Sequence, residues 1–187
     1  MFDFFLAFVL KDGIKLRSVN NIWVNSALMS KFDRIDLQIL NDLQTDGRLT
    51  NVELARRAGI SAPPCLRRVR TLEESGVIRR YYADLDPSSL GFGVSVFAQV
   101  GLHSQNDSDL RAFEDQVASW SLVRECHMVA GDADFLLKIV ARNWDEYQRF
   151  LSTQLTTTPN VKNVKSKLVI RTSKDLPGVP VDEISEK

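Results

Sequence analysis

The chain has 187 residues, of which 44% are apolar, and its 24 basic residues balance its 24 acidic ones. This apolar fraction is typical of a globular protein and excludes a wholly disordered chain. Two cysteines cannot form a disulfide framework, and the longest apolar run, residues 4–10, is too short for a membrane-spanning helix, which needs about 20 residues. We therefore expect one ordinary domain or two small ones in a reducing compartment.

The first 28 residues differ in pattern from the rest of the chain. The segment 2–10 resembles the apolar part of a signal peptide, but no basic stretch precedes it and no small-residue cleavage site follows. Orderly helix signals begin only after Met29. We expect Met29 to be the native start and residues 1–28 to be an upstream extension of the reading frame, with a disordered tail or a membrane-surface anchor as alternatives.

Three helices are predicted in the first half of the chain. Apolar residues recur at helical spacing over residues 33–45. Thr50 and Glu53 have the spacing of a capping box, in which each side chain satisfies an unpaired amide, and they open a short second helix. Residues 61–75 form a third helix, capped by a serine and stopped by a glycine. The short connection between the second and third helices predicts a helix-turn-helix, followed by an extended wing over residues 77–85.

Positive charge is concentrated around the third helix. Residues 56–80 hold seven arginines and two glutamates, a net charge of +5, whereas the stretch from residue 91 to the end carries a net charge of −2. The helix is predicted to bury Leu66, Val69 and Leu72, which turns the arginines between them outward. Arginine count alone favours a solvated charged face, but the placement on a helix-turn-helix favours DNA binding. The residues predicted to contact DNA are Ser61, Ala62, Pro63, Arg67, Arg68, Arg70, Arg79 and Arg80.

The second half alternates strands and helices in the order βαββαβ. The expected strands cover residues 94–102, 123–129, 135–140 and 161–172, and the expected helices lie near residues 110–117 and 144–155. This order predicts a ferredoxin-like domain with two helices on one face of an antiparallel sheet. The fold class is thus α+β: a winged helix-turn-helix domain over residues 29–90, a ferredoxin-like domain over 91–172, and a tail over 173–187 that is an ordered arm or a loose end.

Two further groups of residues suggest chemistry. Cys126 and His127 are neighbours on a strand, so their side chains point to opposite faces and cannot converge on one metal or substrate atom. The turn from Gly131 to Asp134 is most often a simple hairpin, although its two carboxylates could also hold a cation or an ammonium group. We predict no catalytic residue, no metal site and no cofactor.

Segments in both halves resemble the Lrp/AsnC (feast/famine) family of regulators. The likeness covers roughly residues 31–172 and is closest to the leucine-responsive branch. In the DNA-binding half it is carried by Asp33-Arg34-Ile35-Asp36, Asp46-Gly47-Arg48, Asn51-Val52-Glu53-Leu54-Ala55 and Pro64-Cys65-Leu66-Arg67-Arg68-Val69. In the second half it is carried by the run from Glu125 to Lys138, which is similar to the family's effector-domain signature.

The resemblance implies a transcription regulator whose ferredoxin-like domains pair into dimers and assemble further, commonly into octamers. It implies an amino-acid effector bound between dimers, with Asp134 or Asp132 receiving the ammonium group. Trp144 and Lys167 depart from the leucine-binding pattern, so the amino acid stays open. Asn51 joins the DNA-binding set. The implied effector-binding residues are Met128, Gly131, Asp132, Asp134, Trp144, Lys167, Leu168 and Val169.

The function predicted from the sequence is a sequence-specific, DNA-binding transcriptional regulator that responds to an amino acid and is not an enzyme. Its expected partners are double-stranded DNA, a small effector and further copies of itself, without a membrane, in the cytoplasm at the nucleoid. One alternative is a nucleoid-structuring protein with little effector response. Another is a small-molecule-binding regulatory subunit of an enzyme, which would need neither the helix-turn-helix nor its arginines.

Overall fold

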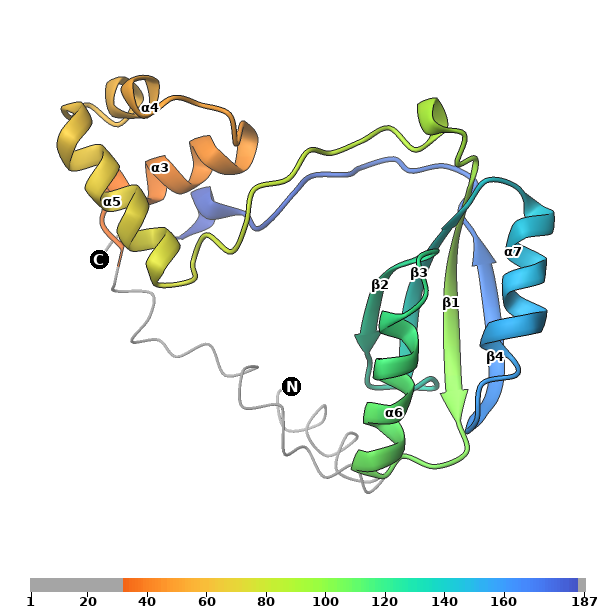
Figure 1. Ribbon diagram of the computed structural model, residues 1–187. Coiled ribbons are helices and arrows are strands. Elements are labelled where there is room, and N and C mark those ends of the chain that lie inside the picture. The colour runs from red at the N-terminus through yellow and green to blue at the C-terminus, as the bar shows by residue number, and fades with distance from the viewer. Residues whose placement is uncertain (1–31, 185–187) are drawn as a thin grey trace. The chain divides into compact units, whose positions relative to one another are not determined.

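The computed structural model describes residues 32–184, which form two compact units (Figure 1). The helical unit contains the described residues up to Asp84 together with those from Lys174 onward, and the sheet unit contains Leu85–Ser173. The expectation that the native protein starts at Met29 concerns residues outside this described range. None of the helices within residues 32–184 is long and apolar enough to cross a membrane.

Three helices build the helical unit: α3 (Arg34–Thr45), α4 (Asn51–Arg57) and α5 (Ala62–Glu74). A capping box opens α3, because the Asp33 carboxylate accepts the amide of Asp36 while the Asp36 carboxylate accepts the amide of Asp33. The helices pack around one small core, whose fully or almost fully buried members are Ile39, Leu54, Ala55, Cys65 and Leu72.

The buried stripe of α5 differs from the prediction at one position. Cys65 is fully buried, whereas Leu66 is 39% exposed. Val69 and Leu72 pack against the core as expected. Arg68 also differs from the prediction, because its guanidinium meets Asp33 and Asp36 at the start of α3 instead of pointing outward.

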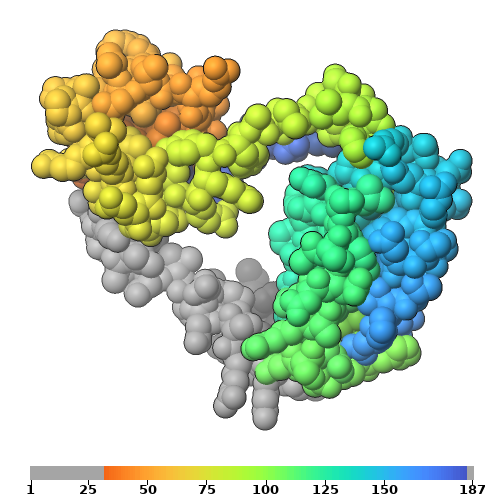
Figure 2. All heavy atoms as spheres, in the orientation of Figure 1, coloured from red at the N-terminus to blue at the C-terminus, as the bar shows by residue number. Residues whose placement is uncertain are grey.

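The segment after α5 forms no β-hairpin. Gly76 adopts a φ of 73° just beyond the helix, a conformation that glycine tolerates, and it ends α5 as predicted. Residues 79–86 contain neither helix nor strand. A wing needs a second strand to pair with, and the described chain supplies none here. The segment is exposed throughout and is visible as the yellow-green chain in Figure 2.

The sheet unit has the predicted βαββαβ order. Its four antiparallel strands lie in the order β2-β3-β1-β4, and both helices cover one face (Figure 1). The last strand ends four residues earlier than expected, and a single π-helical turn over Leu151–Leu155 extends the second helix. The elements are β1 (Val94–Leu102), α6 (Asp107–Ala118), β2 (Val123–Met128), β3 (Phe135–Ala141), α7 (Trp144–Phe150) and β4 (Val161–Leu168).

The two faces of this sheet differ in burial. Alternate residues of β1 and β3, such as Val96, Ala98 and Ile139, are fully buried under the helices. The residues between them point to the opposite face, where Phe97 and Val140 are only partly buried. We call this opposite side the open face of the sheet.

Candidate DNA-binding and effector sites

The N-terminal tip of α5 exposes a hydroxyl and apolar groups. Ser61 occupies the N-cap position, but its side chain accepts no hydrogen bond from the helix. The reason lies in the sequence, because an N-cap oxygen normally accepts the amides two or three residues later, and Pro63 and Pro64 have none. Pro63 is exposed and Ala62 is partly buried. The tip can therefore offer the Ser61 hydroxyl and small apolar surfaces to a partner.

Asn51 links the starts of α4 and α5. Its Nδ2 donates a hydrogen bond of 2.8 Å to the carbonyl of Ala62, and its Oδ1 is buried without a partner among the described residues. The sequence predicts Asn51 as a DNA contact. In the structure its side chain instead bonds α4 to the start of α5 within the helix-turn-helix.

Three of the seven arginines make ion pairs inside the helical unit. The Arg68 guanidinium lies 2.8 Å from carboxylate oxygens of both Asp33 and Asp36 at the start of α3. The hydrogen bonds that it donates to them, the one to Asp36 above all, raise the pKa of Arg68. Arg56 and Arg57 both bind the carboxylate of Glu53. Arg57 and Arg68 thus link α4 and α5 to α3, whereas Arg56 pairs within α4 and stays exposed. The engagement of Arg68 differs from the outward placement predicted for it.

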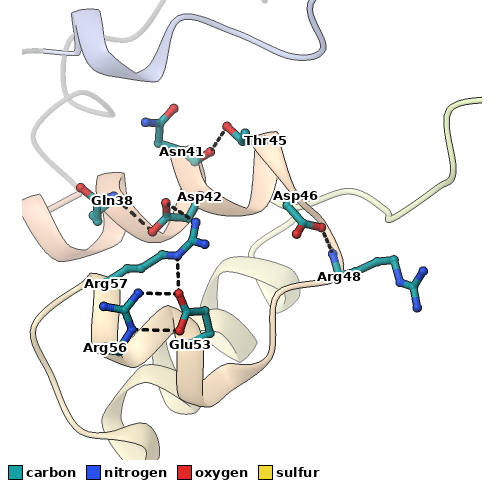
Figure 3. A network of polar contacts seen from close by, with 9 residues as sticks. All are labelled: Gln38, Asn41, Asp42, Thr45, Asp46, Arg48, Glu53, Arg56 and Arg57. Atoms are coloured by element: carbon teal, nitrogen blue, oxygen red, sulfur yellow. Dashed lines mark hydrogen bonds and ion pairs between the residues drawn. The ribbon is translucent and has the colours of Figure 1, made fainter.

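The Glu53 network is drawn in Figure 3. Arg56 donates to both carboxylate oxygens of Glu53 at 2.9 and 2.7 Å, and Arg57 donates at 2.8 Å. The Arg57 Nη1 atom also lies 3.5 Å from Asp42, which joins α4 to α3. Hydrogen bonds from Arg56 and Arg57 lower the pKa of Glu53 to about 2. The predicted capping box is therefore half formed: Thr50 accepts the Glu53 amide at 3.2 Å, while the Glu53 carboxylate is occupied by the arginines.

The remaining four arginines form an exposed cationic set. Arg67 and Arg70 lie on the exposed side of α5, and Arg79 and Arg80 lie in the segment after it. None of the four makes an ion pair within residues 32–184. The Arg80 guanidinium sits 5.8 Å from the ring centre of Tyr82, a cation–π distance. We call these four residues the free arginines.

The Gly131–Asp134 turn contains one engaged and one available carboxylate. Asp134 accepts the amide of Leu102 at 2.6 Å and the side-chain amide of Gln105 at 2.7 Å, so both of its oxygens tie the turn to the end of β1. Asp132 is exposed and has no hydrogen-bond or ion-pair partner among the described residues. Gly131 has a φ of 141°, which side chains rarely adopt.

The residues implied to bind the effector lie in two groups toward opposite ends of the sheet. Met128 pairs with Phe135 at the start of β3, next to the Gly131–Asp134 turn. Trp144 follows the far end of β3, and Leu168 pairs with Val96 close to that same end. A seven-residue strand separates the groups by about 20 Å. One protomer alone does not bring these residues into a single pocket.

The group at the far end is exposed and partly apolar. Trp144 is 44% exposed and Leu168 is 47% exposed, while Met128 in the first group is 51% exposed. The Trp144 ring packs at 5.2 Å against Tyr147, whose hydroxyl is hydrogen-bonded to that of Ser166 on β4. Lys167 and Val169 flank Leu168, with Lys167 exposed on the open face and Val169 partly buried.

Cys126 and His127 lie on opposite faces of β2, as the strand geometry predicts. Cys126 pairs with the fully buried Leu137 on the helix-covered side, and burial raises the pKa of its thiol to about 11. His127 is exposed and lies 3.2 Å from Glu125. Within residues 32–184, no three His, Cys, Asp or Glu side chains are grouped so that they could hold a metal ion.

Two family descriptions match the chain in the expected order. "Winged helix-turn-helix DNA-binding" matches residues 32–79, and "Lrp/AsnC ligand binding domain" matches residues 95–179. The leucine-responsive regulatory protein of Rhizobium meliloti is 56% identical over 145 residues, which is 78% of this chain and 93% of that protein. The chain belongs to the Lrp/AsnC family. It is a transcriptional regulator with a DNA-binding helix-turn-helix and a ligand-binding domain, as the sequence predicted.

Two further transcriptional regulators are similar to most of this chain. The Bkd operon transcriptional regulator of Pseudomonas aeruginosa is 41% identical over 143 residues, covering 76% of this chain and 94% of that one. Among solved structures, a transcriptional regulator of Neisseria meningitidis in complex with L-methionine has a TM-score of 0.79 and 32% identity, covering 82% of this chain and 99% of that one. This likeness supports the α+β fold of helix-turn-helix and antiparallel sheet.

Sequence reasoning about this Lrp/AsnC member missed two kinds of residue. The acidic partners of Arg68 were visible as the Asp33-x-x-Asp36 spacing of a capping box, but the spacing does not show that an arginine from another helix meets it. Gln44 on α3, which binds the C-terminal tail, carries no sequence signal, because a glutamine on a helix surface is ordinary.

Proposed function

We propose that this Lrp/AsnC regulator binds specific sites in duplex DNA through the tip of α5 and the free arginines. The observation that carries the proposal is the division of the seven arginines, in which Arg67, Arg70, Arg79 and Arg80 are exposed and make no ion pair in the described part of the chain. Two of these lie on the helix whose N-terminal part enters the major groove in helix-turn-helix proteins. The other two follow it and are suited to backbone phosphates.

The proposed effector is an amino acid. Its support is the ligand-binding domain together with the L-methionine complex of the Neisseria regulator. Asp132 has a free carboxylate for the ammonium group, since a charge-assisted hydrogen bond is stronger than a neutral one. Asp134, the other candidate, holds the turn in place. Met128 and Trp144 supply apolar surface, which favours an apolar side chain on the effector.

We further propose that the effector site is completed by a second copy of the chain. The candidate residues form two groups about 20 Å apart, so contact between copies is the way to unite them in one pocket. The open face supports pairing as well, since Phe97, Leu136 and Val140 stand there partly exposed. Apolar surface of this kind is typical of an interface. The proposed assembly is a dimer that associates into octamers and acts at the nucleoid, without catalytic activity.

The test is to select DNA fragments bound by the full chain from a random pool and to measure their affinity with and without each amino acid. The proposal expects a shared sequence motif and a change in affinity with at least one apolar amino acid. A bound pool without any motif would overturn sequence-specific binding. A motif whose affinity no amino acid changes would overturn the effector role and favour the nucleoid-structuring alternative.

A further inference from the structure

The C-terminal tail returns to the first helix of the helical unit. After β4 ends at Leu168, the chain runs without helix or strand until the short 3₁₀ turn η4 (Val181–Glu183). Gln44 on α3 holds this tail at Val179: its Nε2 donates to the Val179 carbonyl at 2.8 Å, and its Oε1 accepts the Val179 amide at 2.9 Å. A side-chain amide that pairs with both backbone groups of one residue fixes the position and the direction of that segment.

Two more features make this contact specific. Val181 is only 5% exposed, in a turn that contacts α3 (Figure 1). Gly178 has a φ of 72°, and a side chain at this position would collide with the Gln44 amide. The tail therefore requires a glycine directly before the residue that Gln44 binds, as well as an apolar residue that α3 covers.

The docking changes how the two units are connected. The chain passes from one unit to the other twice, at Asp84–Leu85 and again at Ser173–Lys174. The first connection lies within residues 79–86, which have no helix or strand. The second begins at the end of β4, where the proposed effector residues Leu168 and Val169 lie. The ten residues 169–178 between β4 and the docked Val179 can span at most about 36 Å.

We propose that residues 174–184 act as a strap whose docking on α3 limits the positions from which the helical unit can reach DNA. The proposal rests on the proposed DNA-binding function. A unit held by one linker without helix or strand can reach half-sites over a range of spacings, because only the length of that linker limits its position. A second connection adds a second limit and narrows that range, so the strap makes the regulator selective for the spacing of its half-sites.

The test compares the full-length wild type with two variants that release the strap. Gln44→Ala removes both hydrogen bonds to Val179, and Gly178→Ala introduces the collision and strains the backbone. Gln38→Ala is the matched control, because Gln38 lies on the same helix but bonds to Asp42. Hydrogen exchange of the Val179 amide should accelerate about tenfold or more in both release variants and stay unchanged in the control, since local opening sets this rate.

The functional measurement uses DNA duplexes carrying two half-sites selected by the wild type, with the spacer lengthened one base pair at a time. Wild type and Gln38→Ala should lose about tenfold in affinity away from the best spacing, whereas the release variants should vary by about threefold or less. Lost exchange protection with an unchanged spacing profile would overturn the strap, as would a wild-type Val179 amide that exchanges as fast as in Gln44→Ala. If the Val179 amide of the wild type exchanges slowly but the protein selects no DNA site, the proposed function is overturned. The slow exchange would then still show that the tail docks on α3.

Discussion

At the scale of single residues, identical side chains serve different purposes according to what surrounds them. Arg56 and Arg67 are both exposed arginines on neighbouring helices of the helix-turn-helix. The first is held by Glu53 in a two-point hydrogen bond, while the second has no acidic partner among the described residues. An arginine already bound to a carboxylate must give up that bond to reach a phosphate or a base. The difference can be measured.

Replacing Arg67 or Arg70 by alanine should weaken binding to a selected DNA site by about 1–3 kcal/mol where the side chain reads a base. Arg56→Ala is the control and should change affinity less, because its guanidinium is committed to Glu53. Fluorescence anisotropy titrations over a range of salt concentrations will measure both the affinity and the loss of phosphate contacts. Equal effects of all three substitutions would show that ion pairing within the helical unit does not decide which arginines meet DNA.

Substitutions of Asp132 and Asp134, the two carboxylates of the Gly131–Asp134 turn, should have different effects. Asp134→Ala removes the acceptor for the Leu102 amide and for Gln105, so it should lower the free energy of unfolding by about 1–3 kcal/mol. Asp132→Asn should leave that energy within about 0.5 kcal/mol of wild type but abolish the response to amino acids. Urea unfolding gives the first quantity and DNA titration in the presence of amino acids gives the second. A stable Asp134→Ala variant would mean that its hydrogen bonds are dispensable.

At the scale of elements, α5 buries Cys65 where the sequence pattern favours Leu66. The helix buries Cys65 and Leu72 but leaves Leu66 39% exposed. Leu72→Ala should therefore cost about 2–5 kcal/mol of stability, because it opens a cavity in a small core. Leu66→Ala should cost less than about 1 kcal/mol. If thermal unfolding gave the two variants similar losses, α5 would be oriented as the sequence pattern alone suggests.

The order of the elements could be read from the sequence because each has its own local signal. Alternating apolar residues defined β1 from Val94 to Leu102, and Gly76 marked the end of α5. The burial of Cys65 in place of Leu66 could not be read in this way, because cysteine and leucine at adjacent positions both satisfy a helical apolar stripe. The difference is visible only in the tertiary packing, where Cys65 joins Ile39 and Leu54 in the core.

The candidate site was predictable in its residue types but not in its pairings. Sequence spacing placed arginines on α5 and carboxylates in the Gly131–Asp134 turn. It could not show which were already engaged, because their partners come from elsewhere in the chain: Asp36 for Arg68, and Leu102 for Asp134. The docking of the tail on α3 could not be predicted from the sequence for the same reason, since Gln44 and Val179 are 135 residues apart.

At the scale of the whole molecule, the proposed association of copies depends on the open face of the sheet. Phe97 and Val140 are only partly buried on that side, opposite the face that α6 and α7 cover. A protomer that keeps such residues in contact with water loses hydrophobic free energy that a second copy can restore, at roughly 25 cal/mol per Å² of apolar surface buried. Lys138 lies between Leu136 and Val140 on the open face, opposite Phe97, and bonds to Glu125.

Light scattering of the wild type should therefore give a mass of at least twice the 21.1 kDa of the chain. Val140→Lys should shift the protein toward the monomer, because a lysine cannot be buried unpaired at an apolar interface without a large desolvation cost. Lys162→Glu, an exposed change near the start of β4, is the control for altered charge and should leave the mass unchanged. On the proposal that a second copy completes the effector site, the response to amino acids should fall in Val140→Lys together with the mass. A monomeric wild type that still responds to an amino acid would place the whole effector site within one protomer.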